Sequence, residues 1–266
     1  MNQPVKLSWP ATHEFWEIPV LFEDEHLFAL DKPAGLLTSP DRLAPERPSL
    51  MPLVHGGIAA GKPWARERNL AYLANAHRLD LDTSGVLLLA KSKAALIALA
   101  DLFGSGAVVR NQLTLVQGVP PEEAFVVAEK LGPHPLQPGR MRIDPRTGKK
   151  STTEFVVLER FSRWSLVRCR LHQERPQQIL LHLNHAGLPV VGDEAHGGKK
   201  LWLSRLKRDF RLKPGREERP LISRVLLHVE ELSLTHPVTQ QPVSIKSEWP
   251  KDLRVAVKYL RLYGKV

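Results

Sequence analysis

The sequence predicts an α+β fold, and three observations support this prediction. Short apolar runs of strand length, bounded by turn residues, recur along most of the chain. Only a few segments show the longer apolar periodicity of a helix, and they are interspersed among the strands. Neither an internal repeat nor a low-complexity tract divides the 266 residues. We therefore expect one continuous domain with a mixed or antiparallel sheet and a few flanking helices.

The first part of the chain predicts an arm, a hairpin and a long loop. Residues 1–19 are interpreted as an N-terminal arm in front of a domain that spans residues 20–266. The apolar runs Val20–Phe22 and Leu27–Leu30 flank a polar stretch, which predicts a β-hairpin. Residues from about 40 to 70 carry scattered Pro, Gly and Arg, which predicts a loop with little regular structure.

The remainder of the chain predicts helices among further strands. Val86–Ala90 is an uninterrupted apolar run and predicts a buried strand, after which Ser92 can cap a helix that reaches about Phe103. Two more helices are predicted, over Gln177–Ala186 with Gly187 at its end, and from Pro250 or Lys251 to about Leu262. The other predicted strands are Leu113–Val116, Phe125–Lys130, Glu154–Leu158, Ser165–Leu171, Leu226–Leu234 and Val243–Lys246.

The composition restricts the function classes. Lys and Arg together number 38 against 28 for Asp and Glu, a formal net charge of +10 at pH 7. Such a charge attracts polyanions, nucleic acid first, although it also serves simple solubility. Cys169 is the only cysteine, which excludes a disulfide scaffold and a cysteine-based zinc or iron–sulfur site. No apolar run reaches the ~18 residues of a membrane span and the start does not resemble a signal peptide, so a cytoplasmic protein is expected.

One segment concentrates the positive charge. Between Lys199 and Arg219, nine basic and three acidic residues give a net charge of +6. Trp202 and Phe210 are interleaved, an arrangement typical of surfaces that face RNA. The solvated face of a helix would have a similar composition, and both interpretations remain open. The basic residues are Lys199, Lys200, Arg205, Lys207, Arg208, Arg211, Lys213, Arg216 and Arg219.

Two further patterns are weak signals of ligand sites. Residues 56–62 match the G-x-x-x-x-G-K part of a phosphate-binding loop, but Pro63 stands where a Ser or Thr would hold magnesium. His182 and His185 lie three residues apart on a predicted helix, without an evident third metal ligand. We therefore expect neither a nucleotide site nor a metal site.

The segment that starts at His77 is the richest in groups that carry chemistry. It reads H-R-L-D-L-D-T-S-G and continues as an apolar run, so a polar turn leads into a buried strand. Asp80, with a cation nearby at Arg78, has the placement of a nucleophile or general base. From the residues alone, the alternative is that Asp80 and Asp82 accept hydrogen bonds from amides of the turn.

This segment resembles the H-R-L-D-x-x-T-S-G signature of the RluA-type pseudouridine synthase family. Other stretches resemble further elements of that family, in the family's order, over residues from about 20 to 255. They are Leu30–Gly35 (similar to N-K-P-x-G), Gly139–Asp144 (a mid-domain stretch), Gln178–Asp193 (the third motif) and Leu227–Pro237 (the C-terminal stretch). No S4-type RNA-binding module is expected in front of this domain.

The resemblance implies a pseudouridine synthase fold, with a bent mixed or antiparallel sheet, flanking helices and a central RNA cleft. It also implies a monomer that isomerises uridine to pseudouridine in structured rRNA or tRNA, without a cofactor or a metal. Asp80 would be the catalytic aspartate at the glycosidic carbon of a flipped-out uridine, and Arg78 would fill the vacated stack. The RNA-binding residues would be Lys32, His77, Arg78, Thr83 and Arg175.

Two positions depart from the family pattern. Gln112 stands where the family has a Tyr that stacks on the target uracil and takes the C5 proton, and an amide cannot serve as that base. Leu180 replaces the arginine of the third motif that pairs with the catalytic aspartate. An enclosed Asp80 carboxylate without a partner would cost about 3–5 kcal/mol, unless another cation such as Arg175 took that place.

Two hypotheses for the function follow. The first is an RNA uridine isomerase that uses Asp80, and the second is a catalytically impaired or inactive RNA-binding paralogue that acts as an RNA-folding factor. Both predict an RNA affinity that falls steeply with salt, whereas only the first predicts a product that disappears with Asp80→Ala. A protein-binding scaffold without an RNA role would show no affinity for structured RNA at physiological salt.

Overall fold

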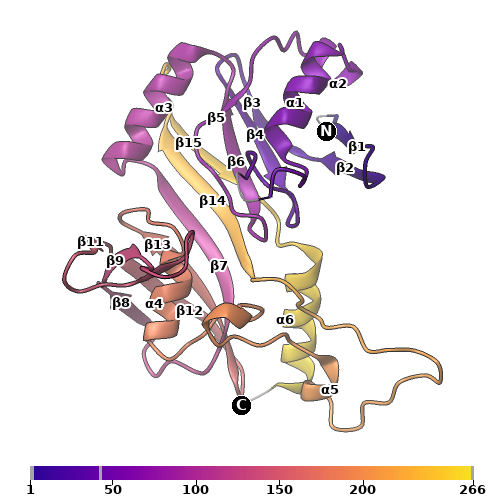
Figure 1. Ribbon diagram of the computed structural model, residues 1–266, viewed down its shortest axis with the longest axis vertical. Helices are drawn as coiled ribbons and strands as arrows, with labels where there is room; N and C mark the ends of the chain where they lie inside the picture. The colour runs from indigo at the N-terminus through magenta and orange to yellow at the C-terminus, as the bar shows by residue number, and fades with distance from the viewer. Residues whose placement is uncertain (1–2, 42–43, 265–266) are drawn as a thin grey trace. The chain divides into compact units, whose positions relative to one another are not determined.

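The computed structural model describes residues 3–41 and 44–264, and the chain folds into two units (Figure 1). Both units contain helices and strands, so the predicted α+β class is confirmed. The predicted single domain differs from the structure because the unit boundaries fall inside the strands β7 (Val109–Gln117) and β14 (Leu227–Thr235), where no linker marks them. Unit 1 comprises Met1–Arg110 and Val229–Glu248, and unit 2 comprises Asn111–His228 and Trp249–Val266.

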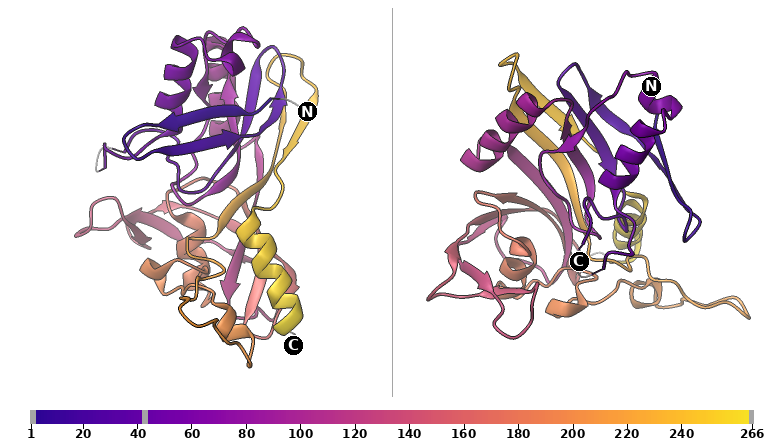
Figure 2. Two further views of the ribbon diagram at one scale, coloured as in Figure 1. Left: turned by 90° about the vertical axis from the view of Figure 1, so that its right-hand side faces the viewer. Right: turned by 45° about the horizontal axis from the view of Figure 1, so that its top comes forward.

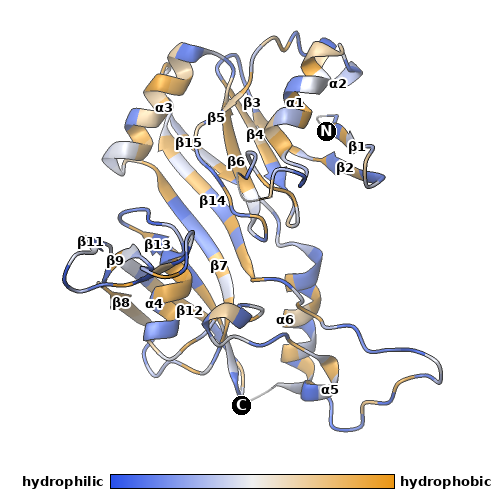
Figure 3. Cartoon of the chain, in the orientation of Figure 1, coloured by the Kyte–Doolittle hydropathy of each residue, from blue (hydrophilic) through white to orange (hydrophobic). Residues whose placement is uncertain are grey.

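The main sheet of unit 1 contains the strands that the apolar runs predicted. The order of its strands is β3-β4-β6-β14-β15, and β5 pairs with the C-terminal end of β6. All seven residues of β6 are buried, which explains the uninterrupted apolar run in its sequence (Figure 3). The strands are β3 (Val20–Glu23), β4 (Leu27–Lys32), β5 (Ala74–Asn75), β6 (Ser84–Ala90), β14 and β15 (Pro242–Lys246).

A hairpin occupies most of the segment interpreted as an arm. The strands β1 (Val5–Trp9) and β2 (Glu14–Ile18) pair in antiparallel fashion and are drawn in indigo in Figures 1 and 2. Val5, Leu7 and Ile18 are each at most 3% exposed and belong to the core of unit 1. The structure therefore corrects the arm interpretation, because apolar and polar residues alternate along β1 as in a half-buried strand.

Two helices, α1 (Leu50–Ala59) and α2 (Pro63–Arg66), lie in the segment predicted to be a loop. The prediction was wrong for two reasons. The first turn of a helix tolerates a proline such as Pro52. Gly57 is not a helix breaker here but is needed for the close packing of α1 on α2. A Cβ atom at Gly57 would lie 2.4 Å from Cζ2 of Trp64, so glycine lets α1 approach the indole of α2. Residues 56–62 thus form the end of α1 and the turn after it.

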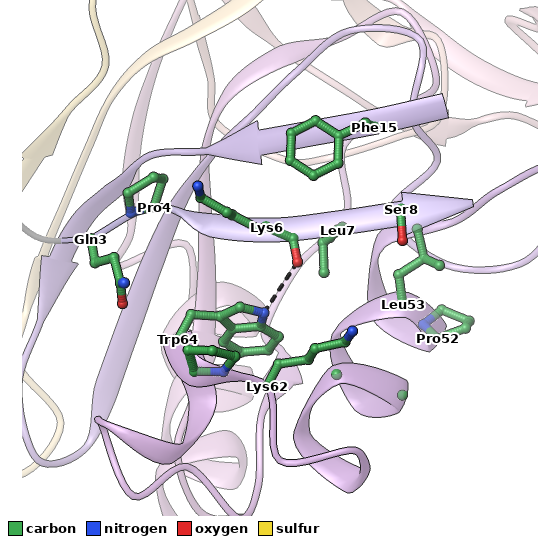
Figure 4. A pocket seen from close by; sticks show the side chains of 13 residues that line it. Gln3, Pro4, Lys6, Leu7, Ser8, Phe15, Pro52, Leu53, Lys62 and Trp64 are labelled. Atoms are coloured by element: carbon green, nitrogen blue, oxygen red, sulfur yellow. Dashed lines mark hydrogen bonds between the residues drawn. The ribbon is translucent and has the colours of Figure 1, made fainter. Parts of the chain in front are cut away.

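The hairpin and these two helices surround a cavity of about 520 Å³ within unit 1 (Figure 4). Leu7, Leu53 and the exposed ring of Phe15 contribute to its mostly apolar lining. Nε1 of Trp64 donates a hydrogen bond to the carbonyl oxygen of Lys6 at 3.1 Å. This bond joins α2 to β1 and holds the hairpin against the helices.

The helix α3 (Lys93–Ser105) confirms the prediction made from its capping residue. Oγ of Ser92 accepts a hydrogen bond from the N–H of Ala95 at 3.1 Å, so the hydroxyl satisfies one of the free amides of the first turn. Ala95 and Leu99 are buried and belong to the same hydrophobic core as the residues of β6. Gly106 ends the helix in a left-handed conformation, with φ of 74°.

Unit 2 contains two sheets. The larger is antiparallel, with the order β7-β13-β12-β8, and the smaller has the order β10-β9-β11. The predicted strand Phe125–Lys130 is divided between them, because β8 ends at Val127 and β9 begins at Lys130. The strands besides β7 are β8 (Ala124–Val127), β9 (Lys130–Pro133), β10 (Met141–Ile143), β11 (Lys149–Lys150), β12 (Thr153–Arg160) and β13 (Trp164–Leu171).

The helices of unit 2 are α4 (Gln178–His185), α5 (Leu203–Leu206) and α6 (Lys251–Tyr263), with a short 3-10 turn, η1 (Glu194–His196). α4 and α6 confirm the two helices predicted for this part of the chain. Apart from α5, the basic segment Lys199–Arg219 is irregular, so its interpretation as a helix face is wrong. None of the helices within the described ranges is long and apolar enough to cross a membrane.

Candidate active site

The signature loop, which we define as residues 77–83, connects β5 to β6 in unit 1. The loop feeds directly into Ser84 and Gly85, the first residues of β6. Gly85 has a φ of +110°, and a Cβ atom there would lie 2.2 Å from the carbonyl oxygen of Val229. Only glycine combines this conformation with such a close backbone approach, which explains the glycine of the T-S-G sequence.

Hydrogen bonds hold the backbone of the signature loop on both sides of Asp80. Oγ1 of Thr38 donates to the carbonyl oxygen of Leu79 at 2.7 Å and accepts from the N–H of Leu79 at 3.0 Å. The N–H of Gly35 donates to the carbonyl oxygen of Leu81 at 2.8 Å. Both contacts come from the segment that follows β4: Gly35 is the last residue of the stretch similar to N-K-P-x-G, and Thr38 lies three residues after it. This segment therefore fixes the backbone position of Asp80.

Lys32, the last residue of β4, is fully buried. Its Nζ donates hydrogen bonds to the carbonyl oxygens of Pro33 at 2.8 Å and Thr83 at 2.9 Å. Thr83 is also buried, and its N–H donates to the carbonyl oxygen of Asp80 at 3.1 Å. Lys32 therefore joins the end of the signature loop to the end of β4, and it offers no exposed atom for the RNA contact expected from the sequence.

His77 is buried at the start of the signature loop and stacks on Phe103, with ring centroids 4.9 Å apart. Its Nε2 accepts a hydrogen bond from the N–H of Leu88 at 3.0 Å, which a neutral ring can do. Burial and, after it, the nearby Arg110 guanidinium lower the pKa of His77 well below its usual range. The neutral imidazole thus holds the loop against β6, a role different from the expected RNA contact.

Between these anchors, the side chains of Arg78 and Asp80 are exposed, whereas Leu79 is buried in the core of unit 1. The loop therefore presents a guanidinium and a carboxylate two residues apart. Asp80 is exposed, so the residues of unit 1 do not impose the desolvation cost that was expected for an enclosed carboxylate. An exposed carboxylate on a fixed backbone can attack an electron-poor carbon or take a proton.

The two positions that depart from the family pattern lie in unit 2. Gln112 is buried on β7, opposite Cys169 of β13. Leu180 is half-buried on α4 and packs against a hydrophobic cluster that includes Ile179 and Leu183. Both residues are therefore part of well-packed surroundings within unit 2.

Arg175 lies just before α4 and is half-buried. Its backbone N–H donates to Oε1 of Gln178 at 3.0 Å, and its Nη1 donates to the carbonyl oxygen of Glu174 at 3.2 Å. Its Nε is buried and makes no hydrogen bond with any described residue. An unsatisfied buried donor favours a polar ligand at this guanidinium.

Polar side chains also attach α4 to the neighbouring strand β12. Nδ1 of His182 lies 2.9 Å from Oγ1 of Thr153, and its Nε2 lies 3.2 Å from Oγ of Ser151. Gln178 donates to the same Thr153 hydroxyl at 2.9 Å. His182 is therefore a core histidine held by two hydroxyls, and burial lowers its pKa. Within the described ranges, no group of three or more His, Cys, Asp or Glu residues could hold a metal ion.

Asp144, in the stretch similar to the family's mid-domain element, closes the turn between β10 and β11. Its Oδ2 accepts from Oγ1 of Thr147 at 2.6 Å and from Arg142 at 3.1 Å. Its Oδ1 accepts from the N–H groups of Thr147 at 3.0 Å and Arg146 at 3.1 Å. These bonds, led by those from Thr147, hold the pKa of Asp144 well below its usual range. The carboxylate therefore stabilises a turn.

Sequence reasoning did not identify Thr38 as part of the site. Its contact with Leu79 joins residues 41 positions apart, and no local pattern around Thr38 distinguishes it from an ordinary loop residue. The N-K-P-x-G resemblance was the nearest signal, since it drew attention to Leu30–Gly35.

Comparison with known proteins gives consistent matches. Residues 26–185, which include the signature loop, match the family described as RNA pseudouridylate synthase. The chain is 34% identical over 247 residues to the ribosomal large subunit pseudouridine synthase D of Xylella fastidiosa, covering 92% of this chain and 70% of the relative. It is 32% identical over 254 residues to the ribosomal large subunit pseudouridine synthase C of Escherichia coli, with shares of 91% and 70%. The solved structure of human RNA pseudouridylate synthase domain containing 4 has the same fold, with a TM-score of 0.69, 21% identity and shares of 91% and 92%.

Proposed function

The chain belongs to the RNA pseudouridylate synthase family, and from this premise we propose that it isomerises uridine to pseudouridine in structured RNA with Asp80 as its catalytic carboxylate. The observation that carries the proposal is the presentation of Asp80. Hydrogen bonds from Thr38 and Gly35 fix the backbone on both sides, while the carboxylate itself stays exposed. A reacting group held in this way needs little reorganisation when it meets its substrate.

The proposed reaction breaks the bond between N1 of uracil and C1′ of ribose and forms a bond between C5 and C1′. Asp80 attacks or assists at C1′, the freed uracil turns, and the base rejoins the ribose through C5. C5 loses a proton and N1 gains one, so the atoms balance. If Asp80 attacks, the bond between its carboxylate oxygen and C1′ breaks again when C5 bonds to C1′, so the carboxylate is regenerated. The net change is confined to the uridine, and the scheme uses neither a redox cofactor nor a metal.

The remaining residues of the site take two kinds of role in this proposal. Arg78 is exposed beside Asp80 and fills the stack that the flipped uridine vacates. Arg175, with its unsatisfied Nε, contacts the RNA. The buried residues Lys32, His77 and Thr83 position the signature loop and do not touch the RNA.

The names of the relatives support a substrate class. Both relatives described above are named for the large ribosomal subunit, which favours ribosomal RNA over transfer RNA as the substrate. We place this activity in the cytoplasm, where ribosomal RNA of a bacterial type is made and modified, and assign it to a monomer.

Gln112 and Leu180 set a condition on this mechanism. An amide is not a base at neutral pH, so a group other than Gln112 takes the C5 proton. Leu180 supplies no charge, so a cation other than residue 180 accompanies the carboxylate when RNA covers it. Both points make the reaction testable against the alternative of an inactive RNA-binding paralogue.

The experiment measures pseudouridine by mass spectrometry in bulk ribosomal and transfer RNA incubated with the purified protein. Wild type should form pseudouridine, whereas Asp80→Ala should form none, because no other carboxylate takes its position in the loop. RNA affinity is measured for both proteins, and it should be equal within about twofold, since exposed loop carboxylates repel phosphates only weakly at physiological salt.

The outcomes separate the hypotheses. Product from both proteins would contradict the role of Asp80. No product from either protein, on RNA isolated without its modifications and with binding intact, would identify an RNA-binding paralogue and overturn the proposal.

A further inference from the structure

A basic loop in unit 2, which we define as residues 207–219, takes no part in the proposed chemistry. Its two ends are fixed, because Leu201 and Ile222 pair with each other and, together with Leu206, belong to a hydrophobic cluster of unit 2. Oε1 of Glu218 also accepts a hydrogen bond from the N–H of Ser204 at 2.8 Å. Figures 1 and 2 show the chain between these ends as a long excursion from α5.

A tight turn reverses the chain at the end of this excursion. The N–H of Arg216 donates to the carbonyl oxygen of Lys213 at 3.1 Å, across Pro214 and Gly215. Pro214 followed by a glycine with φ of +74° is the pattern of a type II turn. The turn therefore presents one cation on each side of its tip.

The cations of the basic loop are available to an external anion. Lys207 is the exception, since its Nζ lies 5.8 Å from the centre of the Tyr263 ring. The others are exposed, and within the described ranges none of them forms an ion pair with a carboxylate, although Asp209, Glu217 and Glu218 lie in the same segment. These exposed cations are Arg208, Arg211, Lys213, Arg216 and Arg219.

We propose that the basic loop binds the phosphate backbone of structured RNA without reading its sequence. Four of the five exposed cations are arginines, whose planar guanidinium matches a phosphate with two parallel hydrogen bonds. They are spread over two chain segments joined by a turn, so they can meet successive phosphates instead of a single anion. The proposal rests on the proposed function only in taking RNA as the ligand, and it adds affinity for RNA and not rate.

The test compares two variants with the same change in charge. The loop variant carries Arg211→Gln, Lys213→Gln and Arg216→Gln. The control variant carries Lys251→Gln, Arg254→Gln and Lys258→Gln, three exposed positions on α6 of the same unit. Each is titrated, as the full chain, with a short RNA duplex and with a single-stranded RNA of equal length, both of arbitrary sequence, over a series of salt concentrations.

The loop variant should bind both RNAs roughly tenfold or more weakly at physiological salt, because each lost phosphate contact removes the release of about one counterion. The slope of log affinity against log salt should fall by about 2 to 3, whereas in the control variant it should fall by less than about 1. At saturating RNA the rate of pseudouridine formation should be unchanged.

Two results would overturn the inference: equal losses in both variants, which indicate a general effect of net charge, or an unchanged affinity and salt slope in the loop variant. The latter would leave an acidic protein surface as the partner of this loop. The binding measurement does not depend on product formation. An inactive chain whose affinity still depends on the loop refutes the proposed function alone, and an active chain whose affinity does not depend on it refutes this inference alone.

Discussion

Thr38 makes two hydrogen bonds with Leu79, one as donor and one as acceptor, directly before Asp80. Thr38→Val keeps the shape of the side chain and removes both bonds, whereas Thr38→Ser keeps the hydroxyl. We expect kcat to fall by roughly tenfold to a hundredfold in the valine variant, because a small displacement of a reacting group has effects of that size. The RNA dissociation constant should not change.

The measurement for Thr38 is the rate of pseudouridine formation at saturating RNA, with RNA affinity and melting temperature recorded in parallel. The melting temperature matters because the valine variant leaves a buried N–H and carbonyl of Leu79 without partners, at a cost of about 1–3 kcal/mol. An equal loss of kcat in the serine variant, or a loss of RNA affinity without a loss of kcat, would contradict a positioning role.

Gln112 and Leu180 allow a second prediction at this scale. If these replacements limit the rate, the double variant Gln112→Tyr with Leu180→Arg should form pseudouridine faster, because a phenol and a guanidinium return to the two positions. The assay is the initial rate on the same RNA, with circular dichroism to show that the variant is folded. A folded double variant that is no faster would indicate that other residues have taken over both roles.

The residue types of the site were predictable, but their burial was not. Asp80 and Arg78 were identified from the signature and are exposed as a contact with RNA requires. Lys32 and His77 belong to stretches that also resemble the family, yet both are buried and bonded to backbone groups. A lysine or histidine gives no local sign of whether its partner is a carbonyl inside the chain or a phosphate outside it.

Among the elements, α1 offers a matched pair of adjacent glycines. A Cβ atom at Gly57 would lie 2.4 Å from Trp64, which is 3% exposed and held by its bond to Lys6, whereas a Cβ at Gly56 meets nothing within 4 Å. Gly57→Ala should therefore lower the free energy of unfolding by about 1–3 kcal/mol through overpacking. Gly56→Ala should raise it by about 0.5–1 kcal/mol, since alanine is the better helix former.

Urea denaturation of both variants, followed by tryptophan fluorescence, tests this pair. Stabilisation by both substitutions would mean that α1 and α2 are not packed as described. Destabilisation by both would mean that the helix itself, and not the contact with Trp64, responds to the added methyl group.

The elements that sequence patterns predicted best are those whose signals lie within their own sequence. α3 has a capping serine and a closing glycine, and α6 buries Leu253, Ala256, Val257 and Leu260 on one face. α1 escaped prediction because adjacent glycines and a proline weigh against a helix, and only the indole of Trp64, from another element, gives the reason for Gly57. Propensity is a weak guide wherever tertiary contacts decide.

For the molecule as a whole, Asp31 makes stability depend on pH. Burial raises the pKa of Asp31, the bond from Ser247 partly offsets this, and the charge of Glu248 adds to the rise. A raised pKa means that the folded state is penalised once Asp31 ionises, so stability is greater below the folded pKa than above it. Asp31→Asn should therefore raise the melting temperature at pH 7, with a smaller gain in acid below the folded pKa of Asp31, where the carboxyl is protonated.

Asp144 provides the control of opposite sign. Its pKa is lowered in the folded state, so it contributes stability above the unfolded pKa and loses that contribution as the pH falls through the folded value. Asp144→Asn should lower the melting temperature at pH 7, with a smaller loss in acid. Melting curves of the two variants and the wild type at both pH values check the signs, and a pH-independent gain for Asp31→Asn would contradict the burial argument.

Fold class and function were accessible from the sequence, whereas the division into units was not. The signature and its companion stretches span most of the chain and led to the family that the comparisons bear out. The unit boundaries, in contrast, fall within continuous strands, at Arg110 and His228. Sequence patterns reveal a boundary when it lies in a polar, flexible linker, and here the chain has none at these points.

The interleaving of the two units has a consequence for how the chain is made. Unit 1 contains the N-terminus, yet its β14 and β15 come from Val229–Glu248, and unit 2 receives α6 later still. When Arg110 has left the ribosome, β14, the neighbour of β6 in the sheet, has not yet been made. Synthesis of Asn111–His228 comes first and, at ~5–20 residues per second, takes roughly 6–24 s. During that time a strand that is buried in the finished protein has an open edge, the kind of surface on which nascent chains pair wrongly. Both units are thus completed from the C-terminal end, and premature termination anywhere before β14 yields a chain in which neither can close.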